Sequence, residues 1–108
     1  MESWDVSSLQ VEPHKPQVLR SDEHSRAIAI DLPEGEQLQD HQTHEAAWLL
    51  VADGAVEIEG GGETQTAGAG FLAHFEEDER REVRARSHAR VVMILEPWPG
   101  EGHPRRRD

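Results

Sequence analysis

The sequence predicts an all-β domain in which two sheets form a sandwich or a barrel. Seven or eight short segments, either apolar or alternating between apolar and polar residues, recur at near-regular spacing along the 108 residues. Glycine-rich stretches and one Asp-Gly pair separate them, as is typical of tight turns between strands. No segment carries a helical apolar stripe over more than two turns. The length is that of a single domain with a modest hydrophobic core.

Alternation, apolar runs and turns locate the strands. Residues 26–32 and 55–59 alternate with the period of two that suits a half-buried strand. The apolar run 48–52 ends at Asp53-Gly54, which is a strong hairpin signal. Residues 91–95 form the most apolar run and predict a central strand that is buried on both faces. The predicted strands are residues 26–32, 38–41, 48–52, 55–59, 63–66, 71–75, 81–85 and 91–95, and residues 18–19 are a candidate for a further short edge strand.

The first 17 residues show no sustained periodicity and contain Pro13 and Pro16. We expect them to form an extended arm. Trp4 and Leu9 are the side chains that can anchor this arm to the domain or to a second subunit.

The composition restricts the partners and the compartment. The chain has no cysteine, so it has neither a disulfide framework nor thiolate chemistry. Its net charge of −11 argues against nucleic acid and anionic membranes, because both favour a basic surface. No apolar run reaches the roughly 18–20 residues of a membrane span, and the N-terminus lacks the features of a secretory signal. We therefore expect a cytoplasmic protein without nucleic-acid or membrane partners.

Two spacing motifs resemble those of the cupin superfamily, specifically its small single-domain members. The first motif runs from Gly35 through five residues to His41, and six residues separate Ala47 from Gly54 at its end. The frame of the family motif therefore matches at both ends.

The second motif begins at Gly70. Glu76, Asp78 and Arg81 stand where the family has proline, glycine and histidine. The resemblance implies a double-stranded β-helix, or jelly-roll barrel, with short flexible arms at both ends. The implied division of the chain is an N-terminal arm at 1–17, a cupin barrel at 18–97 and a C-terminal tail at 98–108.

In the cupin family, three histidines and one glutamate bind a divalent metal inside the barrel. Only His41 of this chain matches that set. Thr43, Ala47 and Arg81 occupy the positions of the second histidine, the glutamate and the last histidine. The resemblance therefore implies the fold without the usual metal chemistry. Three interpretations of the site follow.

In the first interpretation the site is rebuilt around one divalent transition metal. The ligands are then His41, His44 and His74, with Glu45 as an added carboxylate. His44 lies one residue past the family position and needs a local bulge to turn inward. The chain would then be a metal-dependent enzyme of the oxygenase or isomerase type.

In the second interpretation, which we favour, the barrel binds a small organic ligand and a metal is optional. An inward Arg81 disfavours a divalent ion and selects an anionic ligand such as a carboxylate, phosphate or enolate. His41 and Thr43 supply hydrogen bonds, and Trp48 or Phe75 supplies an apolar wall. Any catalysis would use His41 as the proton carrier.

In the third interpretation the barrel has no small-molecule site and serves association only. Arg81 then pairs with Glu79 or Glu82 outside the barrel, and Trp48 is a core residue. In each interpretation the resemblance implies a homodimer, with the segments around Trp4 and Trp98 as candidate contacts. His14, His24, His88 and His103 lie in predicted turns or tails, and we assign them no function.

Overall fold

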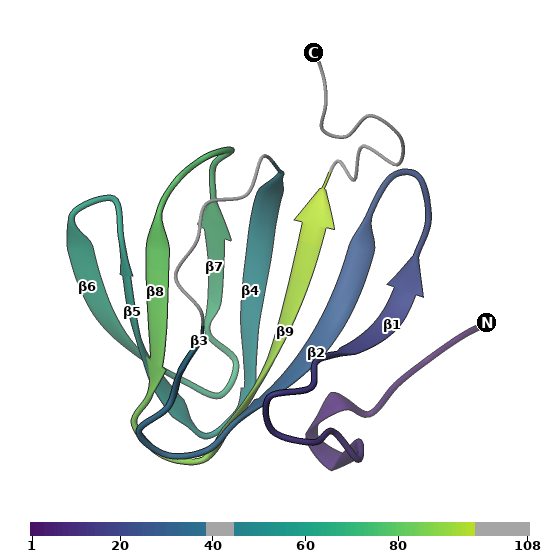
Figure 1. Ribbon diagram of the computed structural model, residues 1–108, viewed down its shortest axis with the longest axis horizontal. Coiled ribbons are helices and arrows are strands. Elements are labelled where there is room, and N and C mark those ends of the chain that lie inside the picture. The colour runs from purple at the N-terminus through teal and green to yellow at the C-terminus, as the bar shows by residue number, and fades with distance from the viewer. Residues whose placement is uncertain (39–44, 97–108) are drawn as a thin grey trace.

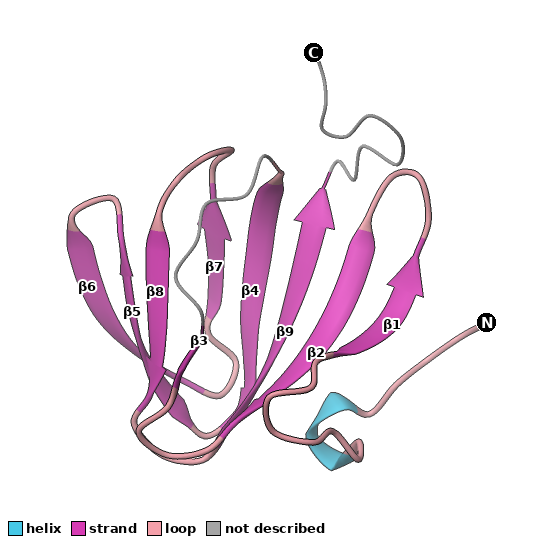
Figure 2. Ribbon diagram, in the orientation of Figure 1, coloured by secondary structure: helices cyan, strands magenta, loops and turns pink. Residues whose placement is uncertain are grey.

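The structure is a computed structural model that describes residues 1–38 and 45–96. Within these residues it contains a short 3-10 helix, η1 (Val6–Ser8), and nine strands (Figures 1 and 2). The strands are β1 (Gln17–Ser21), β2 (Arg26–Leu32), β3 (Gln37–Leu38), β4 (Ala46–Asp53), β5 (Ala55–Gly60), β6 (Glu63–Gly68), β7 (Leu72–Phe75), β8 (Arg81–Ala85) and β9 (Ala89–Glu96).

The strands form two antiparallel sheets, as the sequence predicts. One sheet has the order β1-β2-β9-β4-β7 and the other has the order β3-β8-β5-β6. The predicted bounds of β2 and β8 are confirmed, whereas β4 and β9 extend beyond their apolar runs. Of the strand predicted at residues 38–41, Leu38 belongs to β3, and the other three residues lie outside the described part of the chain.

The predicted central position of β9 is confirmed. It pairs with β2 on one side and with β4 on the other, each over almost its full length (Figure 1). Burial on both faces holds for Val91, Val92 and Met93, while Ile94 is 38% exposed on the outer face. The apolar run therefore predicted the place of the strand better than the burial of each face.

The core lies between the two sheets and follows strand alternation. On β4 the side chains of Ala47, Leu49 and Val51 are fully buried, and the residues between them point to the outer face. Val83 on β8 and Val56 on β5 close the core from the other sheet. Burial of such aliphatic side chains, at about 1.5–3 kcal/mol each, is the main stabilising contribution.

The Asp53-Gly54 pair makes a tight connection between β4 and β5, but the predicted hairpin is wrong. The two strands belong to different sheets, so the turn carries the chain from one sheet to the other instead of pairing its neighbours. Gly54 has φ of +79°. A Cβ there would overlap the carbonyl oxygen of His88, so the position requires glycine for both conformation and space.

An apolar patch lies on the outer face of the five-stranded sheet. Trp48 and Ile94 are directly paired across β4 and β9, and Leu50 and Leu72 are paired across β4 and β7. These four residues, here called the outer patch, are 36–55% exposed. No helix among residues 1–38 and 45–96 has the length and apolarity that crossing a membrane requires.

Candidate functional site

Arg81 points into the barrel. It begins β8 in the same phase as Val83 and Ala85, which are core residues, and the residues between them face outward. Only 5% of its surface is exposed. The sequence left open whether Arg81 faces inward or pairs outside the barrel with Glu79 or Glu82. The strand register places it inside.

The surroundings of Arg81 include polarisable groups from the opposite sheet. Its guanidinium carbon lies 5.5 Å from the ring centroid of Phe75 on β7. Its Nη2 lies 4.0 Å from the Sδ of Met93 on β9. A permanent cation therefore lies in the interior against an aromatic face and a thioether, where it is shielded from water. Phe75 therefore lies beside Arg81 in the interior.

The described residues at this end do not fit a divalent metal. Ala47, at the position of the family's glutamate, points inward but carries no ligating atom. Arg81, at the position of the last histidine, places a cation where a metal would be repelled. Among residues 1–38 and 45–96 no three His, Asp or Glu side chains gather as a metal site. The predicted ligands His41 and His44, and the predicted ligand contact Thr43, lie outside the described residues.

His74 and Trp48 do not face the interior. They are cross-strand partners on the outer face, with ring centroids 4.5 Å apart. The Nε1 of Trp48 donates a hydrogen bond of 2.8 Å to Glu96, and the Nδ1 of His74 lies 3.9 Å from Glu76. The predicted roles of Trp48 as interior wall or core residue, and of His74 as an interior metal ligand, are therefore wrong. Both side chains are out of phase with Ala47 and Phe75.

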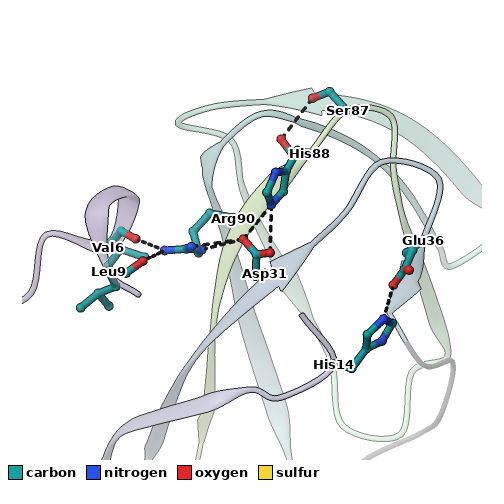
Figure 3. A network of polar contacts seen from close by, with 8 residues as sticks. All are labelled: Val6, Leu9, His14, Asp31, Glu36, Ser87, His88 and Arg90. Atoms are coloured by element: carbon teal, nitrogen blue, oxygen red, sulfur yellow. Dashed lines mark hydrogen bonds and ion pairs between the residues drawn. The ribbon is translucent and has the colours of Figure 1, made fainter. Parts of the chain in front are cut away.

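A second polar cluster lies on the outer face of the five-stranded sheet, over β2 and β9, and was missed by the sequence analysis (Figure 3). Its centre is Asp31 on β2, which is only 6% exposed. The carboxylate accepts a hydrogen bond of 3.1 Å from Nη2 of Arg90 and lies 2.9 Å from Nε2 of His88. Asp31 and Arg90 are directly opposite in the β2–β9 register, so the sheet itself brings the two charges together.

Arg90 also fastens the N-terminal arm. Its Nη1 donates to the carbonyl oxygens of Val6 at 2.7 Å and Leu9 at 2.9 Å (Figure 3). One guanidinium therefore joins a buried carboxylate to two backbone carbonyls, and we call this arrangement the arm clamp. Trp4 is 39% exposed, whereas Val11 of the arm is buried and the Ser7 hydroxyl donates to the carbonyl oxygen of Ala52. The part of the predicted flexible arm around η1 is docked on the barrel.

Comparisons with known proteins agree with this architecture. The family model described as "Cupin domain" matches residues 28–95. No curated protein matches the chain. Among solved structures, a protein of Thermus thermophilus is 20% identical with a TM-score of 0.79, covering 90% of this chain and 98% of its own.

Two further structures are similar in the same way. An RmlC-like cupin protein of Desulfovibrio desulfuricans is 17% identical with a TM-score of 0.78, over 90% of this chain and 97% of its own. KdgF of a Halomonas species is 20% identical with a TM-score of 0.72, over 82% of this chain and 85% of its own. At these identities the structural likeness is evidence for the fold alone.

Proposed function

The chain belongs to the cupin domain family, and we propose that it binds a small organic anion inside its barrel with Arg81 as the anchor. The observation that supports this proposal is the inward position of a side chain that is always charged and yet only 5% exposed. A guanidinium offers two parallel N–H donors, which match the two oxygens of a carboxylate or phosphate. In a site shielded from water this pairing is stronger than at the surface.

In this proposal the other residues of the site belong to the same end of the barrel as Arg81. Phe75, 4% exposed and in contact with the Arg81 guanidinium, provides an apolar surface for the body of the ligand. We propose that His41 and Thr43 complete the site with hydrogen bonds, and that any proton transfer uses His41.

The proposal is tested by carboxylate binding to variants of two arginines on the same strand. Arg81 and Arg84 both lie on β8, but Arg84 is exposed on the outer face and donates to Gln37 at 2.8 Å. Benzoate and acetate are titrated while the unfolding temperature is followed, because bound ligand stabilises the folded state. We expect Arg81→Gln to weaken benzoate binding by roughly 10–100-fold and Arg84→Gln to leave it unchanged. Equal benzoate affinity in the two variants would contradict the proposal.

We also propose that a second copy of the chain covers the outer patch. Trp48, Leu50, Leu72 and Ile94 form a flat apolar surface, and exposed surfaces of this kind are typical of association sites. A sheet face packs well against another sheet face, and an identical copy provides one through a two-fold axis.

The oligomeric state tests this second proposal. In sedimentation equilibrium we expect a dimer for the wild type and a monomer for Leu72→Glu, which places a charge within the patch. Val18→Glu is the matched control, because Val18 is 49% exposed but lies on the edge strand β1, outside the patch. A monomeric wild type, or a Leu72→Glu dimer as stable as that of Val18→Glu, would refute it.

A further inference from the structure

A cavity of about 620 Å³ lies between the N-terminal arm and the β2–β3 corner. The arm contributes His14 and Pro16 to its wall, and β2 contributes residues 30–32. Glu36, Gln37 and Leu38 line the remaining side. The volume lies within the usual range of small-molecule sites, roughly 300–1,000 Å³. Neither Arg81 nor Phe75 lines it, so the cavity is separate from the proposed anion site.

Pro16 explains why this space is open. The β1–β2 pairing ends at Gln17 opposite Ala29, and the preceding residue is Pro16, which has no N–H to continue the ladder. Residues 30–32 of β2 still pair with β9, but no strand in the described part of the chain lies along their other edge. The arm turns away at this point and leaves the cavity beside the strand.

The cavity has both apolar and polar walls. Ile30, Leu32 and Leu38 supply apolar surface, while Glu36 and Gln37 supply a carboxylate and an amide oxygen. The other acidic residue, Asp31, is already neutralised by Arg90 in the arm clamp. Glu36 therefore presents the charge that a ligand would meet, and the side chain of Glu36 is 39% exposed.

The imidazole of His14 contacts the Glu36 carboxylate. The Nε2 of His14 lies 3.1 Å from Oε1 of Glu36 (Figure 3). His14 has φ of +65°, a left-handed conformation that is unfavourable for a residue with a side chain. Its side chain is 72% exposed, and a polar contact exposed to this extent contributes little to stability. A ligand that binds the Glu36 carboxylate more strongly can therefore displace the His14 imidazole at little cost in stability.

We propose that this cavity is a second ligand site, which takes a small organic cation with a planar nitrogen group on an apolar body. The planar group replaces the His14 imidazole on the Glu36 carboxylate, and an amidinium or guanidinium can do so with two parallel hydrogen bonds. The apolar body lies against Ile30, Leu32 and Leu38. His14 then moves aside with its segment of the arm, so it acts as a gate over the site.

Benzamidine is the probe that tests this proposal, because it combines an amidinium with an apolar ring. Binding is measured by titration, with amide chemical shifts of Asp31 and Gln37 reporting the location. We expect saturable shifts at these residues, and at least tenfold weaker binding of neutral benzamide, which has the same shape. Glu36→Gln is expected to weaken benzamidine binding about tenfold, and His14→Ala to strengthen it because a competitor is removed.

Two results would overturn the proposal. One is the absence of saturable shifts at Asp31 and Gln37 in both the wild type and His14→Ala, whose cavity has no competing imidazole. The other is equal benzamidine affinity for the wild type and a folded Glu36→Gln variant. The Arg81→Gln variant separates the two sites: it is expected to lose benzoate binding and to keep benzamidine binding, so either site can fail without the other.

Discussion

Arg81, which is buried, and Arg90, which is partly buried, are both arginines on strands, yet they differ in what their side chains contact. Arg90 points to the outer face, where its side chain is 12% exposed and its donors meet a carboxylate and two backbone carbonyls. Arg81 points into the barrel, where it contacts a phenyl ring and a thioether. The first arginine cross-links parts of the chain. The second places a cation in the interior, where we propose that it binds an organic anion.

The largest effect is expected when the carboxylate of the arm clamp is removed. Asp31→Ala leaves the guanidinium of Arg90, whose side chain is only 12% exposed, without its counter-charge, and such a loss costs about 3 kcal/mol of the free energy of unfolding. Glu2→Ala is the control, because Glu2 pairs with Arg20 at 2.8 Å while the two side chains are 61% and 59% exposed. Its loss should be below about 1 kcal/mol. Urea denaturation measures both values, and similar losses would remove the distinction between clamp and surface pair.

A smaller effect is expected from exchanging either arginine for lysine. In Arg90→Lys a single ammonium cannot span Asp31 and both arm carbonyls, so the free energy of unfolding should fall by about 1–2 kcal/mol. Arg81→Lys keeps a cation in the barrel, and it should retain part of the benzoate affinity that Arg81→Gln loses. Denaturation and benzoate titration of the same two variants provide the test. A clamp that tolerates lysine without loss would show that the forked geometry of Arg90 is unimportant.

The smallest effect concerns Asp22, a carboxylate held mainly by backbone amides. The amide of His24 donates to it at 2.8 Å, and that of Ser25 at 3.1 Å. These two bonds, that of His24 first, lower the pKa of Asp22 below its usual 3.8. A lowered pKa means that the stabilisation is present above pH 3.8 and is lost as the pH falls through the lower folded value. Carboxyl NMR titration should find this depressed pKa, and Ser25→Pro, which lacks the amide donor, should raise it.

Much of the fold could be predicted because its signals are local. Alternation on residues 26–32, the Asp53-Gly54 turn and the apolar run of β9 each act over a few residues. The inward direction of Arg81 depends on the phase of one strand, and the sequence left that phase open between the interior and a pairing with Glu79 or Glu82 outside. The function of the site stays a proposal, since His41 and Thr43 lie outside the described residues.

Two kinds of residue escaped prediction. Residues 46–52 are apolar throughout, so no alternation indicated that Trp48 faces outward with His74 across from it. The arm clamp depends on non-local register, because Asp31 and Arg90 are 59 positions apart and meet only when β2 and β9 pair. The sequence does show an acidic residue, Asp31, near the end of a strand that is mostly apolar. It does not show that β9 pairs with this strand and brings Arg90 opposite Asp31.

The central position of β9 has a consequence for how the chain folds. β2 and β4 are separated in the sheet by a strand that follows both of them in sequence, so the sheet cannot close until residues 89–96 are available. Such non-local pairing makes folding slow, in the range of milliseconds to seconds. During synthesis, β2 and β4 emerge with open edges and remain prone to wrong pairing until β9 leaves the ribosome.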